Sequence, residues 1–341
     1  MATAALRSEE RETKKRSGGW QRWALAFILI AAIVGAALHF GQLRQFGMLL
    51  RQARPVWLLA AFGLQILTYV CVAAGWYVVL KAGESKLSLR RLFGLALAKL
   101  FTDQAVPAAG MGGNVLMVDR LIACGIPRGN AAAALILSVI GYYAGFALMG
   151  VIALVLLWYH HKATLVLGGT VSLFLVVAFA IPAFALWLRR RGRRSLPHWM
   201  ARIGPLRRMM ETVSEAPSDL LTDRMLLVKV AVLNALVLLA DAATLSACLL
   251  ALGSPQAFST AYIAMIIAQI AVTLGPVPLG LGAFEGASTG MLRLLGVPFE
   301  AALAATLLLR GFTLWLPLIP GLLATRRMAK WGRDKNCLPE P

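Results

Sequence analysis

Three charged side chains interrupt the most apolar parts of this 341-residue sequence. Asp241 lies midway along one apolar run, Arg310 lies near the middle of another, and Glu285 directly follows a stretch rich in glycine and proline. A charge at the centre of a membrane helix costs about 2.5–3.5 kcal/mol on insertion scales, so it needs a partner or a cavity. Such residues are typical of sites that bind a polar group in apolar surroundings.

Arg310 and Asp241 leave two interpretations open. They could form a mutual buried ion pair that only fixes packing, or they could bind a substrate. Thr306 and Thr313 lie four residues before and three residues after Arg310, a spacing that places all three on one helix face. Glu285 is expected to be functional, because a broken helix exposes unpaired backbone groups beside a cavity.

A second set of polar residues lies in and around an earlier glycine-rich segment. Asn114 and Arg120 could contact a substrate, or they could lie at the membrane interface with their polar ends in water. Lys99 and Asp103 precede them and are four residues apart, which allows an ion pair on one helix face.

No constellation typical of an enzyme is found. The sequence has no Walker loop for ATP, no Gly-x-Ser-x-Gly elbow and no paired His/Glu metal site. The spacing of the four cysteines suits neither a zinc site nor a disulfide framework. We therefore expect no catalytic residue, no metal and no cofactor.

The composition predicts an all-α, polytopic membrane protein. Hydrophobic residues make up 59% of the chain and charged residues only 14%, against roughly 25% charged residues in soluble proteins. The apolar runs do not alternate as barrel strands do, and about 20 apolar residues cross a bilayer as a helix. Six full spans are expected: Trp23–Phe40, Val56–Leu80, Ala131–Tyr159, Ala163–Leu188, Leu226–Leu252 and Ala301–Thr325.

Two further apolar segments, Leu92–Leu121 and Phe258–Leu295, are interrupted. The interruptions contain Pro107, Gly110, Gly112 and Gly113 in the first segment, and Pro276, Pro278, Gly280 and Gly282 in the second. Paired interrupted segments in corresponding positions point to a transport site in an inverted repeat. We expect two re-entrant hairpins of half-helices, with ordinary kinked spans as the alternative.

Positive charge predicts the orientation, because cytosolic loops of membrane proteins are rich in Lys and Arg. Six such residues lie in the N-terminal tail, nine between Arg189 and Arg224, five in the C-terminal tail and none at 253–257. The expected organisation is a cytosolic basic tail (1–22), one transmembrane domain (23–325) with a cytosolic loop (189–225), and a cytosolic tail (326–341). The two hairpins then enter the membrane from opposite faces.

The net charge of +19 has two interpretations. The basic residues could simply occupy cytosolic loops, or they could contact anionic lipid headgroups. Nucleic acid is not expected as a partner, because no soluble domain would present a basic face to it.

The segment Pro276-Val-Pro-Leu-Gly-Leu-Gly-Ala-Phe-Glu285, followed by Leu309-Arg310-Gly-Phe-Thr313, resembles the most specific motif of the lysylphosphatidylglycerol synthase transmembrane-region family. The stretch from Pro107 through Asn114 to Arg120 is similar to its weaker N-terminal motif. The resemblance covers about residues 20–328. It implies lipid translocation along a path formed by re-entrant helices.

The chain departs from the family pattern at Asn114, where an acidic residue is often found, and at Met117, where an arginine is often found. Fewer charges of this kind favour a less charged substrate than an aminoacylated phospholipid, which is consistent with the hopanoid-associated subgroup. We expect no soluble aminoacyl-transferase domain and therefore no synthase activity.

The leading hypothesis is a flippase or transporter of the bacterial inner membrane, which moves an anionic or isoprenoid lipid between leaflets without ATP. The alternative is a membrane enzyme or accessory subunit of lipid or isoprenoid (hopanoid) biosynthesis. A third hypothesis is a structural partner of lipid-biosynthesis enzymes.

The orientation can be tested with cysteines introduced into a cysteine-free variant and labelled by a membrane-impermeant reagent. Residues 195–205 and the C-terminal tail should be labelled from the cytosolic side, and a Ser254→Cys variant from the outer side, because basic loops stay inside. Labelling of Ser254→Cys from the cytosol alone would overturn the orientation.

Overall fold

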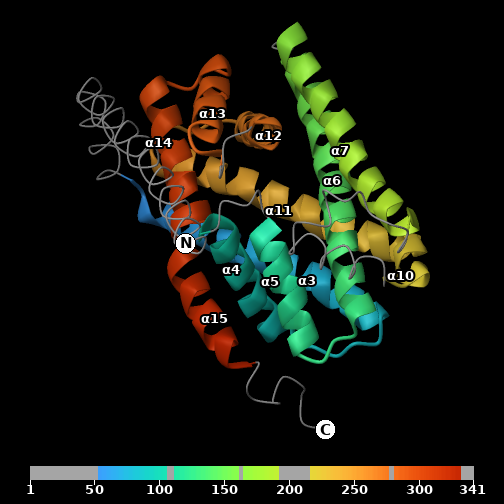
Figure 1. Ribbon diagram of the computed structural model, residues 1–341. Coiled ribbons are helices and arrows are strands. Elements are labelled where there is room, and N and C mark those ends of the chain that lie inside the picture. Colours follow the sequence, from blue (N-terminus) through green and yellow to red (C-terminus); the bar gives the residue numbers. More distant parts are fainter. Residues whose placement is uncertain (1–52, 106–110, 161–163, 192–215, 276–279, 332–341) are drawn as a thin grey trace, which may run out of the picture. The chain divides into compact units, whose positions relative to one another are not determined.

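The computed structural model describes residues 53–105, 111–160, 164–191, 216–275 and 280–331, and all regular structure in these ranges is helical (Figure 1). This confirms the all-α prediction for the described part of the chain. Three expected segments lie outside the described residues: the N-terminal tail (1–22), the first span (Trp23–Phe40) and residues 332–341 of the C-terminal tail.

Within the residues that the structure describes, five helical stretches are long and apolar enough to cross a membrane. They are Pro55–Ala82 (α3), Arg128–Tyr159 (α6), Leu165–Phe184 within α7 (Leu165–Arg191), Arg224–Ala251 (α11) and Phe299–Arg327. They agree with five of the expected spans to within a few residues. The chain is therefore a multi-pass membrane protein.

The helix starts follow from local chemistry. Pro55 opens α3, where its missing N–H costs nothing because the first turn has no carbonyl to bond. A five-residue helix, α10 (Ser218–Thr222), precedes α11. The Asp223 side chain then caps α11 by accepting hydrogen bonds from the backbone N–H groups of Met225 and Leu226.

Both interrupted segments form pairs of short helices. The first pair is α4 (Leu89–Ala105) and α5 (Met111–Ala123), and the second is α12 (Phe258–Leu274) and α13 (Ala283–Leu294). The helices of each pair pack against each other. The longest has 17 residues, or about 26 Å of rise, which is less than the roughly 30 Å of the hydrocarbon core.

The predicted loop residues divide into three groups. Gly112 and Gly113 were expected in the first loop but lie in the first turn of α5, because the helix already begins at Met111. Gly280 and Gly282 lie in the turn before α13, both with positive φ. The remaining predicted loop residues are outside the described part of the chain: Pro107, Gly110, Pro276 and Pro278.

The two halves of the described chain repeat the same series of helix lengths. α3 and α11 have 28 residues each, α4 and α12 have 17 each, and α5 and α13 have 13 and 12. The connections 83–88 and 252–257 are also equal in length. After α5 and α13 the chain reads Cys124-Gly-Ile-Pro127 and Leu295-Gly-Val-Pro298, and both glycines have positive φ.

Helix packing follows the same repetition (Figure 1). α3 packs on α11, each short pair packs on the long helix before it, and each also packs on the helix after it. In addition, α4 packs on α15 (Leu318–Trp331) of the second half, and α12 packs on α6 of the first half. Each short pair is therefore held by its own half and by the last helix of the other.

The last span is not the continuous helix expected from Ala301–Thr325. It consists of α14 (Phe299–Arg310), a π-helical segment η2 (Gly311–Trp315) and α15. The backbone N–H of Leu316 donates to the Gly311 oxygen, five residues earlier, at 2.9 Å. Pro317 follows and has no N–H to restore the α-helical pattern. The rotation between Arg310 and Thr313 therefore differs from the α-helical value on which their expected common face depends.

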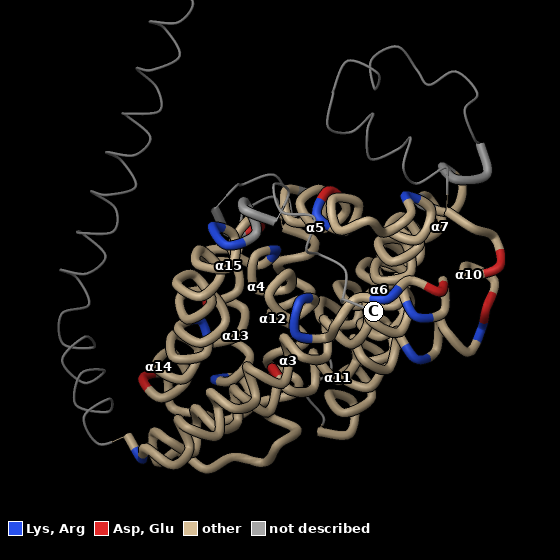
Figure 2. The backbone as a smooth tube through the Cα atoms, turned by 90° about the horizontal axis from the view of Figure 1, so that it is seen from below, with Lys and Arg blue, Asp and Glu red and all other residues tan. Residues whose placement is uncertain are grey.

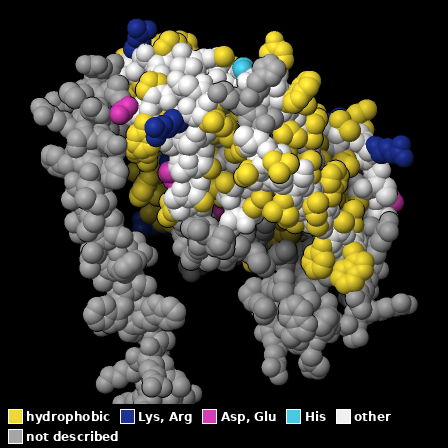
Figure 3. Space-filling model, turned by 90° about the horizontal axis from the view of Figure 1, so that it is seen from above, with side chains coloured by type: hydrophobic (Ala, Val, Ile, Leu, Met, Phe, Trp, Pro, Cys, Tyr) yellow, Lys and Arg dark blue, Asp and Glu magenta, His cyan; other side chains and the backbone are white. Residues whose placement is uncertain are grey.

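The outer surface suits a lipid environment. Figure 2 shows the charged residues (Lys, Arg, Asp and Glu) mainly at helix ends and in connections, and long stretches of helix carry none. Large apolar side chains are exposed along α6 and α7, including Val155, Leu173, Val176 and Phe179. Figure 3 shows apolar side chains over much of the visible face. These exposed side chains would face acyl chains in a bilayer.

Glycines of α6 permit a close approach to α11. A Cβ at Gly145 would lie 2.9 Å from the Ala231 oxygen and 3.1 Å from the Ala235 nitrogen, and a Cβ at Gly141 would lie 2.7 Å from a Val230 methyl carbon. Gly141 and Gly145 are four residues apart, the small-residue spacing that brings membrane helices together.

Gly145→Val should therefore destabilise the protein by about 1–3 kcal/mol, because the added methyl groups meet backbone that cannot move aside cheaply. Thermal unfolding in detergent measures the effect. Gly63→Val is the matched control, since a Cβ at Gly63 meets nothing within 4 Å. Equal stability of the two variants would contradict the close packing of α6 on α11.

Candidate functional site

An ion pair between Arg310 and Glu285 joins α14 to the second short pair. The Arg310 Nε donates to Glu285 Oε1 at 2.7 Å. Arg310 is only 8% exposed, and its guanidinium carbon lies 4.9 Å from the centre of the Phe284 ring. A cation in this position is stabilised by both a carboxylate and an aromatic face.

The same carboxylate also serves the start of α13. Glu285 Oε2 accepts a hydrogen bond from the backbone N–H of Gly282 at 2.7 Å. Gly282 has φ +82°, a conformation that favours glycine. Glu285 is the third residue of α13, where a carboxylate both caps the chain and favours the positive end of the helix dipole. One side chain thus fixes the helix start and the arginine together.

A buried hydroxyl pair fixes α13 against α14 beside this site. Ser288 Oγ and Thr306 Oγ1 are 2.9 Å apart and both side chains are buried. Thr306 was predicted as a substrate contact, and the structure places it in this interhelical bond. Thr313, the other predicted threonine, is half-buried in η2.

The first short pair also has a carboxylate at the start of its second helix, but this carboxylate and its cation both come from the preceding helix. Asp103, near the end of α4, accepts a hydrogen bond from the Gly113 backbone N–H at 2.8 Å and another from Lys99 Nζ at 2.7 Å. The ion pair expected from the spacing of Lys99 and Asp103 is therefore present. Its second role at the start of α5 was missed, although an acid placed just before a Gly-rich interruption could have suggested it. Gly113 leaves no room for a Cβ beside the Asp103 carboxylate.

The two halves differ in charge at the position of the Arg310–Glu285 pair. Glu285 lies nine residues before the end of α13, and Asn114 lies nine residues before the end of α5. Arg310 is the twelfth residue of α14, and the twelfth residue of α6 is Val139. The first half therefore has a neutral amide and an aliphatic side chain where the second half has an ion pair.

Asp241 lies in a different polar cluster, between α11 and α3. Its Oδ1 accepts a hydrogen bond from Gln65 Nε2 at 2.9 Å, and Gln65 Nε2 also lies 3.3 Å from Thr244 Oγ1. The suggested mutual ion pair of Arg310 and Asp241 is wrong, because Arg310 pairs with Glu285. Gln65 was missed in the sequence, although it is the only amide side chain in α3.

Asn114 and Arg120 are half-buried on α5, which packs on α4 and α6. Arg310 and Glu285 lie on α14 and α13 instead. The predicted site residues thus fall into three places: the Arg310–Glu285 pair, the Asp241 cluster and the α5 helix.

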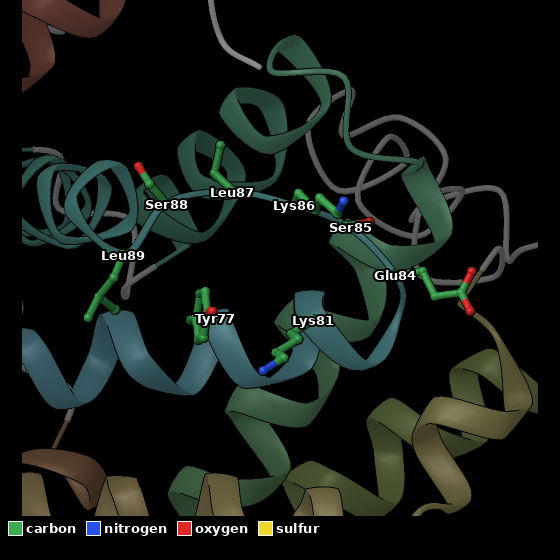
Figure 4. Close-up of a pocket in the computed structure, with 8 residues that line it drawn as sticks. All are labelled: Tyr77, Lys81, Glu84, Ser85, Lys86, Leu87, Ser88 and Leu89. Atoms are coloured by element: carbon green, nitrogen blue, oxygen red, sulfur yellow. The ribbon is translucent and has the colours of Figure 1, made fainter. Parts of the chain in front are cut away.

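A cavity of about 790 Å³ opens at the connection between α3 and α4. Figure 4 shows Tyr77 and Lys81 of α3 on one side of the opening and the connecting residues 85–88 on the other. Lys81 and Lys86 are exposed there. The cavity therefore combines two lysines and the Glu84 carboxylate with an apolar wall from Tyr77 and Leu89.

The family comparison fits this architecture. Residues 23–321 match the family model described as Lysylphosphatidylglycerol synthase TM region. The match concerns the transmembrane region, identifies no catalytic domain and gives no support to the hopanoid-associated subgroup. The search of curated proteins found no match.

The ion pair predicts a specific pattern of stability. Arg310→Ala should cost about 3–5 kcal/mol and lower the amount of protein in the membrane, because it leaves Glu285 as a lone, largely buried charge. Adding Glu285→Gln should restore much of that amount, since the amide oxygen can still accept from Gly282. Quantitative blotting of membranes measures both. Arg293→Ala, at an exposed arginine of α13, is the control, and an unchanged amount of Arg310→Ala would contradict the pairing.

Proposed function

The chain belongs to the lysylphosphatidylglycerol synthase TM region family, and on this premise we propose that it is a lipid flippase or transporter. It moves a phosphate-bearing lipid headgroup between the leaflets of the bacterial inner membrane without ATP. The observation that carries the proposal is the Arg310–Glu285 pair, because it places a buried guanidinium at the start of a short, interrupted helix. Ionisable residues inside a membrane are costly and mark substrate or ion pathways, which supports a functional role for this pair.

A path between two re-entrant hairpins is supported by the repetition of the fold. The two halves share their helix lengths, and the cross-packing of α4 on α15 is matched by that of α12 on α6. The agreement extends to single residues. Gly321 of α15 approaches Phe101 of α4, and Gly150 of α6 approaches Ile270 of α12. Both glycines are the 23rd residue from the start of their span, and Phe101 and Ile270 are both the 13th residue of their helix.

The charges of the two corresponding connections support opposite membrane faces. Lys81, Lys86 and Arg90 lie in or beside the connection 83–88, whereas the equivalent connection, 252–257, has no Lys or Arg. Basic residues are retained on the cytosolic side. The first hairpin would thus enter from the cytosol and the second from the outer side. The lysine-bearing cavity next to the first hairpin would then meet anionic headgroups of the cytosolic leaflet.

Arg310 is suited to a phosphate by its geometry. A guanidinium offers several N–H donors in one plane and can hold a phosphate through two parallel hydrogen bonds. In the absence of substrate, the Glu285 carboxylate binds the guanidinium in place of a phosphate, so the arginine is not left as an unpaired charge. A headgroup phosphate would exchange with the carboxylate, and the released Glu285 would keep its bond to the Gly282 N–H.

Arg310→Lys tests phosphate recognition, because it keeps the charge but loses the planar donor geometry. Losing one charge-assisted hydrogen bond costs about 1.5–3 kcal/mol, so the transport rate should fall roughly 10- to 100-fold. Reconstituted vesicles with a fluorescent phospholipid measure the rate. Arg293→Lys is the control and should transport normally. Normal transport by Arg310→Lys, at equal protein amount, would show that this arginine does not recognise phosphate.

A further inference from the structure

The carboxyl group of Asp241 lies between two long helices and has no ion-pair partner among the described residues. It accepts one hydrogen bond from the neutral amide of Gln65, at 2.9 Å. Thr244, one turn later on α11, donates its own hydroxyl hydrogen to the Ala240 backbone oxygen at 2.8 Å. Among the residues that the structure describes, this acid at membrane depth is therefore held by uncharged groups alone.

Within the described part of the chain, no hydrogen bond or ion pair joins this carboxyl group to a basic side chain. From α3 it is faced by Gln65 and by the phenol of Tyr69, and from α6 by the phenol of Tyr142. From α12, Gln269 donates to the Tyr142 oxygen at 3.3 Å. The adjoining α14 has two charged residues: Glu300 lies in its first turn, and Arg310 is paired with Glu285.

An ionised carboxylate is costly in such surroundings, because one amide donor replaces only part of the hydration that it has in water. Addition of a proton removes the charge and leaves a group that can donate as well as accept. A Gln65 amide can serve either form, with its N–H₂ toward the carboxylate or its oxygen toward the carboxylic acid. The pair can thus hold both protonation states, with a different arrangement of α3 and α11 side chains in each.

This pair is linked to the Arg310–Glu285 site through α3. Tyr69 lies four residues after Gln65, one helical turn along the same face. Its hydroxyl group is 3.5 Å from the backbone oxygen of Phe312, within the π-helical segment that directly follows Arg310. π-helical segments occur frequently at functional sites and leave backbone groups that can change partners. A rearrangement at Gln65 therefore has a short physical route to Arg310.

We propose that Asp241 is a proton-binding site that couples lipid movement to a proton gradient. The inference rests on the proposed lipid transport. A proton from water on one side of the membrane adds to the carboxylate, and the acid then donates to the Gln65 oxygen. The change is passed through Tyr69 and η2 and loosens the Arg310–Glu285 pair for exchange with a headgroup phosphate. Release of the same proton to the other side restores the carboxylate and completes the cycle.

The test uses the full chain in phospholipid vesicles with a fluorescent phosphate-bearing lipid. Its distribution between leaflets is measured with and without an imposed pH difference. If one proton moves with each lipid, a difference of one pH unit should shift the steady-state ratio by up to about tenfold, since a tenfold ratio corresponds to 1.4 kcal/mol. A protonophore should abolish the shift. Wild-type movement that ignores the pH difference would overturn the proton site while leaving lipid transport intact, and no movement at all would refute the transport function itself.

Variants assign the proton to Asp241. Asp241→Asn keeps the shape and the bond from Gln65 but cannot take up a proton, so it should move lipid without responding to the pH difference. Asp219→Asn, at an exposed carboxyl group of α10, should respond as the wild type does. A retained response in Asp241→Asn overturns the proposal. If Asp241→Asn moves no lipid, Asp241→Glu decides: a pH-dependent shift in that variant supports the carboxyl group as the proton site, and its absence overturns it.

Discussion

Each interrupted helix pair depends on one carboxylate that satisfies a helix start and a cation at the same time. Asp103 binds the Gly113 N–H and Lys99, and Glu285 binds the Gly282 N–H and Arg310. A helix that begins in apolar surroundings leaves backbone N–H groups without water, and a lone acid placed there would be an uncompensated charge. The carboxylate satisfies one of these N–H groups, and the cation compensates the charge of the carboxylate. The short helices, their glycine-rich turns and the packing around them follow from this constraint.

The spans and the interruptions were predictable because each depends on local sequence. Long apolar runs predict membrane helices, and the Gly/Pro clusters before Asn114 and Glu285 end helices wherever they occur. The choice of partner for Arg310 was not predictable in this way. Asp241 and Glu285 are both acids in apolar segments, and only the packing of α13 on α14 decides between them. The π-helical turn after Arg310 was also missed. Its Gly311 and the following Pro317 gave no signal, because membrane helices commonly tolerate glycine and proline.

The repeated architecture and the unequal charges belong together. Matching helix lengths and cross-packing give the two halves a common frame. Within that frame the polar residues differ, because Asn114 and Val139 stand at the positions of Glu285 and Arg310. A common frame allows the halves to move in related ways, and unequal side chains allow one half to hold a charge that the other does not.

The presence of a buried arginine at this position in only one half has an electrical consequence. A membrane potential acts on a charge in proportion to the fraction of the field that the charge crosses, at about 2.3 kcal/mol per elementary charge for 100 mV over the full thickness. If Arg310 and Glu285 belong to the half that opens outward, an anion held there has only a small part of the field between itself and the outer leaflet. Most of the field lies between this anion and the inner leaflet. Movement of the anion between Arg310 and the outer leaflet would then depend less on voltage than its movement between Arg310 and the inner leaflet. The voltage dependence of the current from each movement would report where along the membrane normal the arginine lies.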